Sequence, residues 1–264
     1  MAKRSVSLVP TMGALHDGHL SLVSAAKKKS KIVVVSIFVN PIQFGPAEDY
    51  KRYPRDLKKD LQLLKAYEPI VVFSPDAKEM YGTDFRSFVE VSGLGEKLCG
   101  RSRPGHFRGV TTVVAKLFNI VKPDYAFFGE KDYQQQLIIK KMVKDLNFDT
   151  QIITIPTVRE SDGLAKSSRN KYLSKDERKS APVLYRSLIE AKTMIQAGEK
   201  DPQKIIKEIK RLLSGEAPIE IEYISIVDPE NLEDIKKIKG KVLIALAARV
   251  GKTRLIDNIT ASAK

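Results

Sequence analysis

The segment VPTMGALHDGHLSLV (residues 9–23) contains two of the three histidines of the chain, His16 and His19, in a turn that also holds Gly13 and Gly18. An apolar run precedes the turn and the start of a helix follows it, so the glycines separate two regular elements. A strand, a loose turn and a helix N-terminus form a place for an anion, because the first N–H groups of the helix point at it. Two histidines three residues apart can face one side there and donate hydrogen bonds to a phosphoryl oxygen. The alternative is that both rings only cap backbone groups.

The composition is that of a globular protein. The length of 264 residues predicts one or two domains, and 42% of the residues are hydrophobic while 30% are charged. No apolar run approaches the ~20 residues that a membrane-spanning helix needs, and the N-terminus lacks the apolar stretch of a signal peptide. Because Cys99 is the single cysteine, an internal disulfide is impossible, and we expect a cytoplasmic location.

The formal net charge of +14 has two interpretations. It suits a polyanionic partner such as nucleic acid, or the steering of a small phosphorylated substrate. It also suits the lysine-rich, solvated surface of a heat-adapted protein with many ion pairs. The lysines are spread over helix-like segments and form no basic tail, which favours the second interpretation.

The first part of the chain alternates between strand and helix patterns. We predict strands at residues 5–9, 31–40, 69–75, 125–129 and 150–158, and helices at 19–29, 55–67, 109–121 and 132–146. The strand patterns are almost wholly apolar, which is typical of strands buried on both faces. Such a succession predicts an α/β, Rossmann-like parallel sheet that binds its ligands beyond the carboxyl ends of the strands.

The pattern changes after the segment RESDGLAKSSRNKYLS (residues 159–174). One long helix over residues 175–197, a second over 202–213, an alternating strand over 219–227 and a hairpin around Gly251 are expected. We therefore predict a Rossmann-like domain over residues 1–160 and a smaller α+β domain over residues 161–264.

Two further segments place polar side chains at predicted strand ends. In FFGEKDYQQ (residues 127–135), Lys131 can neutralise phosphate charge, Asp132 can bind ribose hydroxyls and Gln135 projects from the following helix. The alternative for this segment is an ordinary strand-to-helix connection. In FVNPIQFGP (residues 38–46), the neutral amides of Asn40 and Gln43 suit recognition of hydroxyl and carbonyl groups.

Two loops complete the candidate site residues. The segment AKSSRN (residues 165–170) offers cations and hydroxyls suited to clamping phosphates, although a basic loop between domains can simply be solvated. The segment GRSRPGHFRGV (residues 100–110) holds His106, again in a glycine-containing turn. The histidine and cysteine content excludes a zinc site of the usual spacing. Magnesium needs only a carboxylate or two with substrate phosphates, and Asp60 is a candidate ligand.

Taken together, these segments resemble the pantoate–β-alanine ligase family. The resemblance is carried in order by PTMGALHDGH, SIFVNPIQFGP, YPRDL, RPGHFRGVTTVVAKLFNIVKPDYAFFGEKDYQQ, PTVRESDGLAKSSRNKYLS and, more loosely, RLIDN. The family belongs to the nucleotidylyltransferases, which share a His-x-Gly-His motif and a Lys-Met-Ser-Lys-Ser-like loop with class I aminoacyl-tRNA synthetases. The resemblance implies that ATP activates pantoate as an adenylate, which β-alanine then attacks. It also implies that residues 1–160 bind ATP and pantoate and that residues 161–264 serve as a lid or dimerisation domain. A magnesium requirement and a homodimer are implied as well.

The resemblance also assigns site residues. Its ATP-binding residues are Met12, Gly13, His16, His19, Gly129, Glu130, Lys131, Asp132, Val158, Lys166, Ser167, Ser168 and Arg169. Its catalytic residues among them are His19, His16, Lys131 and Arg169. Gln43 and Gln135 would bind pantoate, with Gln43 also near β-alanine, and we add Asn40 to this group.

Two features depart from the family pattern. The first predicted strand begins within the first ten residues, where members usually have a preceding helix. Lys166 stands where members usually have Met or Leu, and it can either contact a phosphate or point to solvent. Two other functions stay open at this point. One is an adenylyltransferase with a different acceptor, and the other is a basic nucleic-acid-binding protein on the same scaffold, whose binding would depend steeply on salt.

Overall fold

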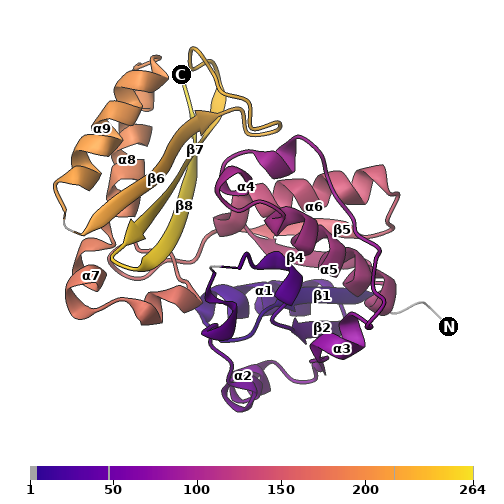
Figure 1. Cartoon of the computed structure of the whole chain (residues 1–264). Coiled ribbons are helices and arrows are strands. Elements are labelled where there is room, and N and C mark those ends of the chain that lie inside the picture. Colours follow the sequence, from indigo (N-terminus) through magenta and orange to yellow (C-terminus); the bar gives the residue numbers. More distant parts are fainter. Residues whose placement is uncertain (1–4, 47, 217, 264) are drawn as a thin grey trace. The chain divides into compact units, whose positions relative to one another are not determined.

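The computed structural model describes residues 5–46, 48–216 and 218–263, and divides the chain into two compact units, Met1–Thr157 and Val158–Lys264 (Figure 1). The division lies three residues before the predicted boundary. The cause is local: the Lys166 N–H donates to the Val158 carbonyl at 2.9 Å, and Arg159 forms a β-bridge with Ala165. These pairings join residues 158 and 159 to the second unit.

The first unit is built on a five-stranded sheet, and its strands are all parallel, as predicted. The order across the sheet is β3-β2-β1-β4-β5, which is the α/β, Rossmann-like arrangement. The strands are β1 (Val6–Thr11), β2 (Ile32–Ile37), β3 (Val71–Phe73), β4 (Tyr125–Gly129) and β5 (Gln151–Ile155).

Helices cover both faces of this sheet. They are α1 (Asp17–Lys29), α2 (Leu57–Leu64), α3 (Ala77–Met80), α4 (Cys99–Ser102), α5 (His106–Val121) and α6 (Tyr133–Asp145). Because successive strand residues point to opposite faces of the sheet, β1 contributes side chains to two hydrophobic cores. Leu8 packs with residues of α5 and α6, while Val9 packs with residues of α1. Across the described residues, every helix is too short or too polar to cross a membrane.

One predicted strand of this unit differs in burial. The sequence predicts a buried strand over residues 69–75, but β3 has only three residues and Val71 is 54% exposed. The reason is its position, since β3 pairs with β2 alone and lies at the edge of the sheet.

The second unit packs helices against an antiparallel sheet of order β6-β7-β8. Its elements are α7 (Lys175–Ser180), α8 (Val183–Gln196), α9 (Pro202–Ser214), β6 (Ile219–Val227), β7 (Lys241–Val250) and β8 (Thr253–Ser262). The hairpin around Gly251 is confirmed. The single helix predicted over residues 175–197 is wrong, because Pro182 lacks the N–H that a continuous helix requires and α8 starts after it.

Candidate active site

The candidate site lies where the strand order of the first sheet reverses. Strand β1 lies between β2 and β4. From β1 the chain adds β2 and β3 on one side of the sheet, and then β4 and β5 on the other side. In an open α/β sheet the carboxyl ends of two such strands leave a crevice for a ligand. The turn after β1 carries the His-x-Gly-His motif, and a 3-10 turn, Glu130–Asp132, follows β4.

The two histidines of the motif form a reciprocal cap at the start of α1. His16 is the N-cap residue, and its Nδ1 accepts from the Gly18 N–H at 3.1 Å. The His19 Nδ1 accepts in turn from the His16 N–H at 3.3 Å, and the two ring centroids are 4.1 Å apart. The interpretation as backbone caps is therefore confirmed, and it does not exclude a role toward a ligand. An Nδ1 that accepts cannot carry a proton, so in each neutral ring the proton is on Nε2.

The electrostatic setting keeps His19 neutral. Burial lowers its pKa to about 3, with further contributions from the neighbouring His16 ring and the Lys131 cation. At neutral pH His19 is thus a hydrogen-bond donor through Nε2 and not an imidazolium. The positive charge of Lys131, in the turn after β4, thus acts on His19.

Asp60 of α2 anchors the turn between β1 and α1. Its carboxylate oxygens accept from the Ala14 N–H at 2.9 Å and from the Leu15 N–H at 2.8 Å, and the residue is 2% exposed. Gly13 has a φ of +78°, and a Cβ there would lie 2.9 Å from Asp60 Oδ2. The buried carboxylate therefore holds the backbone of the turn in place.

The magnesium role predicted for Asp60 stays a prediction. Each of its oxygens already accepts from a backbone N–H group in the protein interior, so a magnesium ion would have to share them. Among the described residues there is also no group of three or more His, Cys, Asp or Glu side chains able to hold a metal ion.

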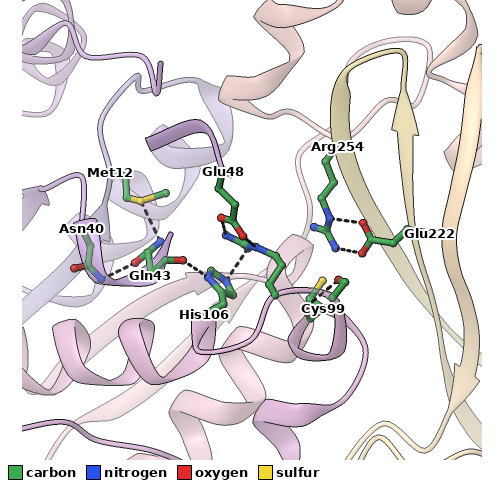
Figure 2. A network of polar contacts seen from close by, with 10 residues as sticks. Met12, Asn40, Gln43, Glu48, Cys99, His106, Glu222 and Arg254 are labelled. Atoms are coloured by element: carbon green, nitrogen blue, oxygen red, sulfur yellow. Dashed lines mark hydrogen bonds and ion pairs between the residues drawn. The ribbon is translucent and has the colours of Figure 1, made fainter. Parts of the chain in front are cut away.

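A chain of hydrogen bonds orients the amide of Gln43 (Figure 2). Tyr81 Oη donates to Asn40 Oδ1 at 2.7 Å, and Asn40 Nδ2 donates to Gln43 Oε1 at 2.9 Å and to the Gly109 carbonyl at 3.1 Å. Gln43 Nε2 then lies 3.1 Å from the Met12 sulfur. Burial raises the pKa of the Tyr81 hydroxyl, which therefore stays protonated and donates. A thioether is a weak acceptor, so the Gln43 N–H groups can readily turn to a stronger acceptor on a ligand.

Asn40, which we predict to bind substrate, is 1% exposed, and its amide bonds to Tyr81, Gln43 and Gly109. It therefore orients Gln43, and its own contact with a substrate stays a prediction.

His106, to which the sequence assigns no role, holds the main chain of Gln43. Its Nδ1 lies 2.8 Å from the Gln43 carbonyl oxygen and its Nε2 lies 2.9 Å from Arg103. A carbonyl only accepts and a guanidinium only donates, so the proton of His106 is on Nδ1. Arg103 also makes two bonds to Glu48, at 2.7 and 2.6 Å. Figure 2 shows Glu48, His106 and Gln43 joined in this network.

The turn after β4 leaves room at Gly129. Its φ of −85° is accessible to any residue, and no heavy atom of the described residues lies within 4 Å of a Cβ built on it. Glycine is therefore required there neither by backbone conformation nor by internal packing. Lys131 Nζ lies 3.7 Å from Asp132 Oδ1, and Glu130 is exposed.

Three successive glutamines of α6 have different surroundings. Gln134 is 6% exposed and bonds to Cys99, Leu94 and Lys97, while Gln136 accepts from Thr154. Gln135, the predicted pantoate ligand, is half-buried between them. Two of the three amides are thus structural, and Gln135 is the more accessible one.

The remaining predicted residues belong to the second unit. Val158 is half-buried and accepts from the Lys166 N–H. Lys166 Nζ lies 3.1 Å from Glu160 Oε2, so this lysine pairs with a carboxylate of its own loop. Ser167 caps a 3-10 turn, Ser168–Tyr172, by accepting from the Arg169 N–H, and Ser168 is 6% exposed.

The sequence missed the residues that orient others. Arg103 and Glu48 lie in or beside quoted motifs, but nothing local indicates their pairing. Tyr81 lies in none of the motifs quoted from the sequence.

Comparison with known proteins gives one family over nearly the whole chain. The family model described as "Pantoate-beta-alanine ligase" matches residues 1–260. A pantothenate synthetase of Acetivibrio thermocellus is 57% identical over 97% of this chain and 91% of its own length. One from Thermosipho africanus is 56% identical over 98% of this chain and 92% of its own.

Solved structures give the same result. A pantothenate synthetase of Thermus thermophilus superposes with a TM-score of 0.94 at 46% identity, covering 97% of this chain and 92% of that one. A pantoate-beta-alanine ligase from Francisella tularensis, described as complexed with beta-gamma ATP and β-alanine, gives 0.81 at 37% identity and covers 98% and 90%.

Proposed function

Because this chain belongs to the pantoate–β-alanine ligase family, we propose that it joins pantoate to β-alanine at the expense of ATP, at the switch point of its first sheet. The chain is an ATP-dependent ligase, and its products are pantothenate, AMP and pyrophosphate. The observation that carries the proposal is the histidine pair, because the Nδ1 atom of each ring accepts a backbone N–H and leaves Nε2–H as a donor.

The first step forms an adenylate. The carboxylate of pantoate attacks the α-phosphorus of ATP, the bond from that phosphorus to the bridging oxygen breaks, and pyrophosphate leaves. Negative charge grows on the phosphoryl oxygens, where preorganised donors stabilise the transition state most. His16 and His19 would donate there through Nε2, and Lys131 would supply positive charge. His19 acts in this scheme as a neutral donor, since its low pKa leaves no imidazolium to release a proton.

The second step transfers the acyl group. The neutral amine of β-alanine attacks the acyl carbon of the adenylate, and the C–O bond to the phosphate breaks. AMP leaves with the electron pair, and the nitrogen releases a proton to solvent to give the amide. No side chain has to act as a covalent nucleophile. The chain contributes alignment of the reactants and exclusion of water from the adenylate.

Substrate recognition is assigned to the glutamines. Gln43 would give up its weak bond to the Met12 sulfur for an oxygen of pantoate, and Gln135 would contribute a second amide. The room at Gly129 suits the close approach of ATP, with Glu130 and Asp132 beside it. In the second unit, Val158 would lie on the adenine side, and Lys166, Ser167, Ser168 and Arg169 would bind phosphates.

Magnesium enters the proposal only as a companion of ATP. A phosphate-bound magnesium ion needs only a carboxylate or two from the protein. Asp60, the predicted ligand, already accepts from the N–H groups of Ala14 and Leu15.

The remaining parts of the proposal concern assembly and location. A homodimer is what the family resemblance implies, and sedimentation at several protein concentrations tests it. A cytoplasmic location is supported by the single cysteine of the chain, which makes no internal disulfide.

The test is AMP formation from ATP and magnesium with pantoate and β-alanine, and with each omitted in turn. We expect AMP only when both are present. His19→Ala should lower the rate at least about a hundredfold, the effect of removing one transition-state donor. Lys28→Ala, at an exposed position of the same helix, is the control and should leave the rate unchanged. A folded wild-type protein that forms no AMP would overturn the proposal.

A further inference from the structure

The segment that leads to Lys166 is a small hairpin. The Glu160 N–H donates to the Leu164 carbonyl at 2.8 Å, and the Lys166 N–H donates to the Val158 carbonyl at 2.9 Å. Arg159 stands opposite Ala165 in the bridge between its two arms. The placement of residues 166–169 within the second unit therefore depends on what holds this hairpin.

Arg159 holds it from one arm through several contacts of its guanidinium. Its Nη1 and Nη2 donate to the two oxygens of Asp257 at 2.7 and 2.9 Å. Nη1 also donates at 3.0 Å to the carbonyl of Gly163, at the hairpin tip. The guanidinium carbon lies 3.7 Å from the centroid of the Tyr185 ring of α8. One side chain thus ties the arm and tip of the hairpin to β8 and α8.

The tip itself is fitted to the same ring. Gly163 has a φ of +93°, and a Cβ there would lie 2.5 Å from the Tyr185 ring. The hairpin backbone is therefore packed on α8 as closely as a residue without a side chain allows.

The carboxylate of Asp257 is buried and therefore needs Arg159 as a partner. It lies on the buried face of β8 with Thr253 and Leu255, and its side chain is 2% exposed. A carboxylate there is costly unless it is paired and hydrogen-bonded. A planar guanidinium satisfies both oxygens at once, which the point charge of a lysine cannot do.

We propose that Arg159 and Asp257 are positioning residues of the ligase reaction, which hold the hairpin so that Lys166–Arg169 present a preformed phosphate-binding loop. Neither residue touches the substrate. The proposal rests on the proposed function, because it assigns the loop to the phosphates of ATP.

A matched ion pair exists in the same unit. Arg254 Nε and Nη2 donate to the two oxygens of Glu222 at 2.8 and 2.6 Å, as Figure 2 shows. The two arginine side chains have comparable exposures, 16% for Arg159 and 19% for Arg254, whereas Glu222 is 21% exposed and Asp257 2%. Arg254 is three residues from Asp257 along β8, so it points to the opposite face of the strand. This pair joins β8 to β6, and it serves as a control for the general loss of an arginine fork.

The experiment compares Arg159→Lys with Arg254→Lys in the full chain. The readouts are the KM for ATP, the KM for pantoate, kcat and the hydrogen exchange of the Glu160 and Lys166 amides. We expect Arg159→Lys to raise the KM for ATP or lower kcat by about tenfold or more, in line with the cost of misplaced binding groups. The KM for pantoate should change little, and both hairpin amides should exchange faster. Arg254→Lys should leave all of these near the wild-type values.

Two further measurements make the result decisive. Asp257→Asn retains one acceptor for Arg159 and should reproduce the selective effect on ATP, whereas Glu222→Gln should not. Equal kinetic constants for the Arg159 and Arg254 variants at equal losses of Tm would overturn the proposal. Faster exchange of the hairpin amides with an unchanged KM for ATP and an unchanged kcat would also overturn it. A wild-type protein that makes no AMP would instead contradict the proposed function, while the exchange data would still report whether Arg159 holds the hairpin.

Discussion

The His16 N–H donates to Nδ1 of His19 at 3.3 Å, so the second histidine of the motif is oriented by the backbone of the residue that caps its helix. The same two histidines therefore form the helix cap and the candidate catalytic group. Each ring uses one nitrogen to terminate the helix and keeps the other as a donor. This double use explains why a helix start here carries imidazoles where serine or aspartate would cap equally well.

Acid should destabilise the folded protein through His19. Its pKa is about 3 in the folded chain and 6.5 in the unfolded one, so between these values the unfolded chain binds a proton that the folded chain does not. The free energy of unfolding should therefore fall as the pH drops below 6.5, by up to about 1.4 kcal/mol per pH unit. Urea denaturation at about pH 7, 6 and 5, above most carboxylate titration, measures this. His19→Asn, which keeps an acceptor for the His16 N–H, should flatten the slope, and an unchanged slope would contradict the assignment.

Asp60→Asn should weaken the turn after β1. One backbone N–H, of Ala14 or Leu15, would face an amide N–H₂ instead of an oxygen, at a cost of about 1–3 kcal/mol in the free energy of unfolding. Asp56→Asn is the control on the same helix, because Asp56 is an exposed N-cap and asparagine caps a helix about as well as aspartate. Chemical denaturation compares the two. A variant of full stability that needs more magnesium would instead favour a role for Asp60 as a metal ligand.

Asn40→Asp should invert the amide of Gln43. The new carboxylate offers no donor to Gln43 Oε1, so the Gln43 N–H₂ would turn toward residue 40 and its oxygen toward Met12. Pantoate would then meet an acceptor where it needs a donor, and its KM should rise by about tenfold or more.

Tyr81→Phe tests the same chain of hydrogen bonds more gently. It keeps the ring contacts with Phe38 and Phe85 but leaves Asn40 Oδ1 without this donor. We expect a smaller increase in the KM for pantoate than for Asn40→Asp. Tyr125→Phe, in the half-buried first position of β4, is the control. Steady-state kinetics that separate pantoate from ATP provide the measurement, and equal effects on both KM values would argue against an orienting role.

Gly129→Ala should separate folding from binding. The added methyl group meets no described heavy atom within 4 Å and the backbone is in an ordinary conformation, so stability should change by less than about 0.5 kcal/mol. If ATP approaches the turn closely, the methyl group should raise the KM for ATP. Gly215→Ala, whose Cβ would meet the carbonyl oxygen of Leu212 at 3.6 Å in the second unit, is the control. An unchanged KM for ATP would remove Gly129 from the nucleotide site.

Much of the fold follows from local patterns. Apolar runs and helical spacing indicate the five parallel strands and the helices between them. The reason is that a buried helix or strand needs apolar residues at the spacing that faces the core. The failures are also physical. β3 is half-exposed because sheet order makes it an edge, and α7 and α8 are separate because Pro182 outweighs the apolar periodicity.

The local sequence indicates the chemical groups of the candidate site, since the histidine pair, the glutamines and the basic loop stand in recognisable motifs. How those groups are held depends on contacts between distant segments. Asp60 lies 45 residues from Leu15, Tyr81 41 from Asn40 and Asp257 98 from Arg159. A helical or strand period extends over neighbouring residues, whereas a buried hydrogen bond is selected by the packing that brings two distant segments together.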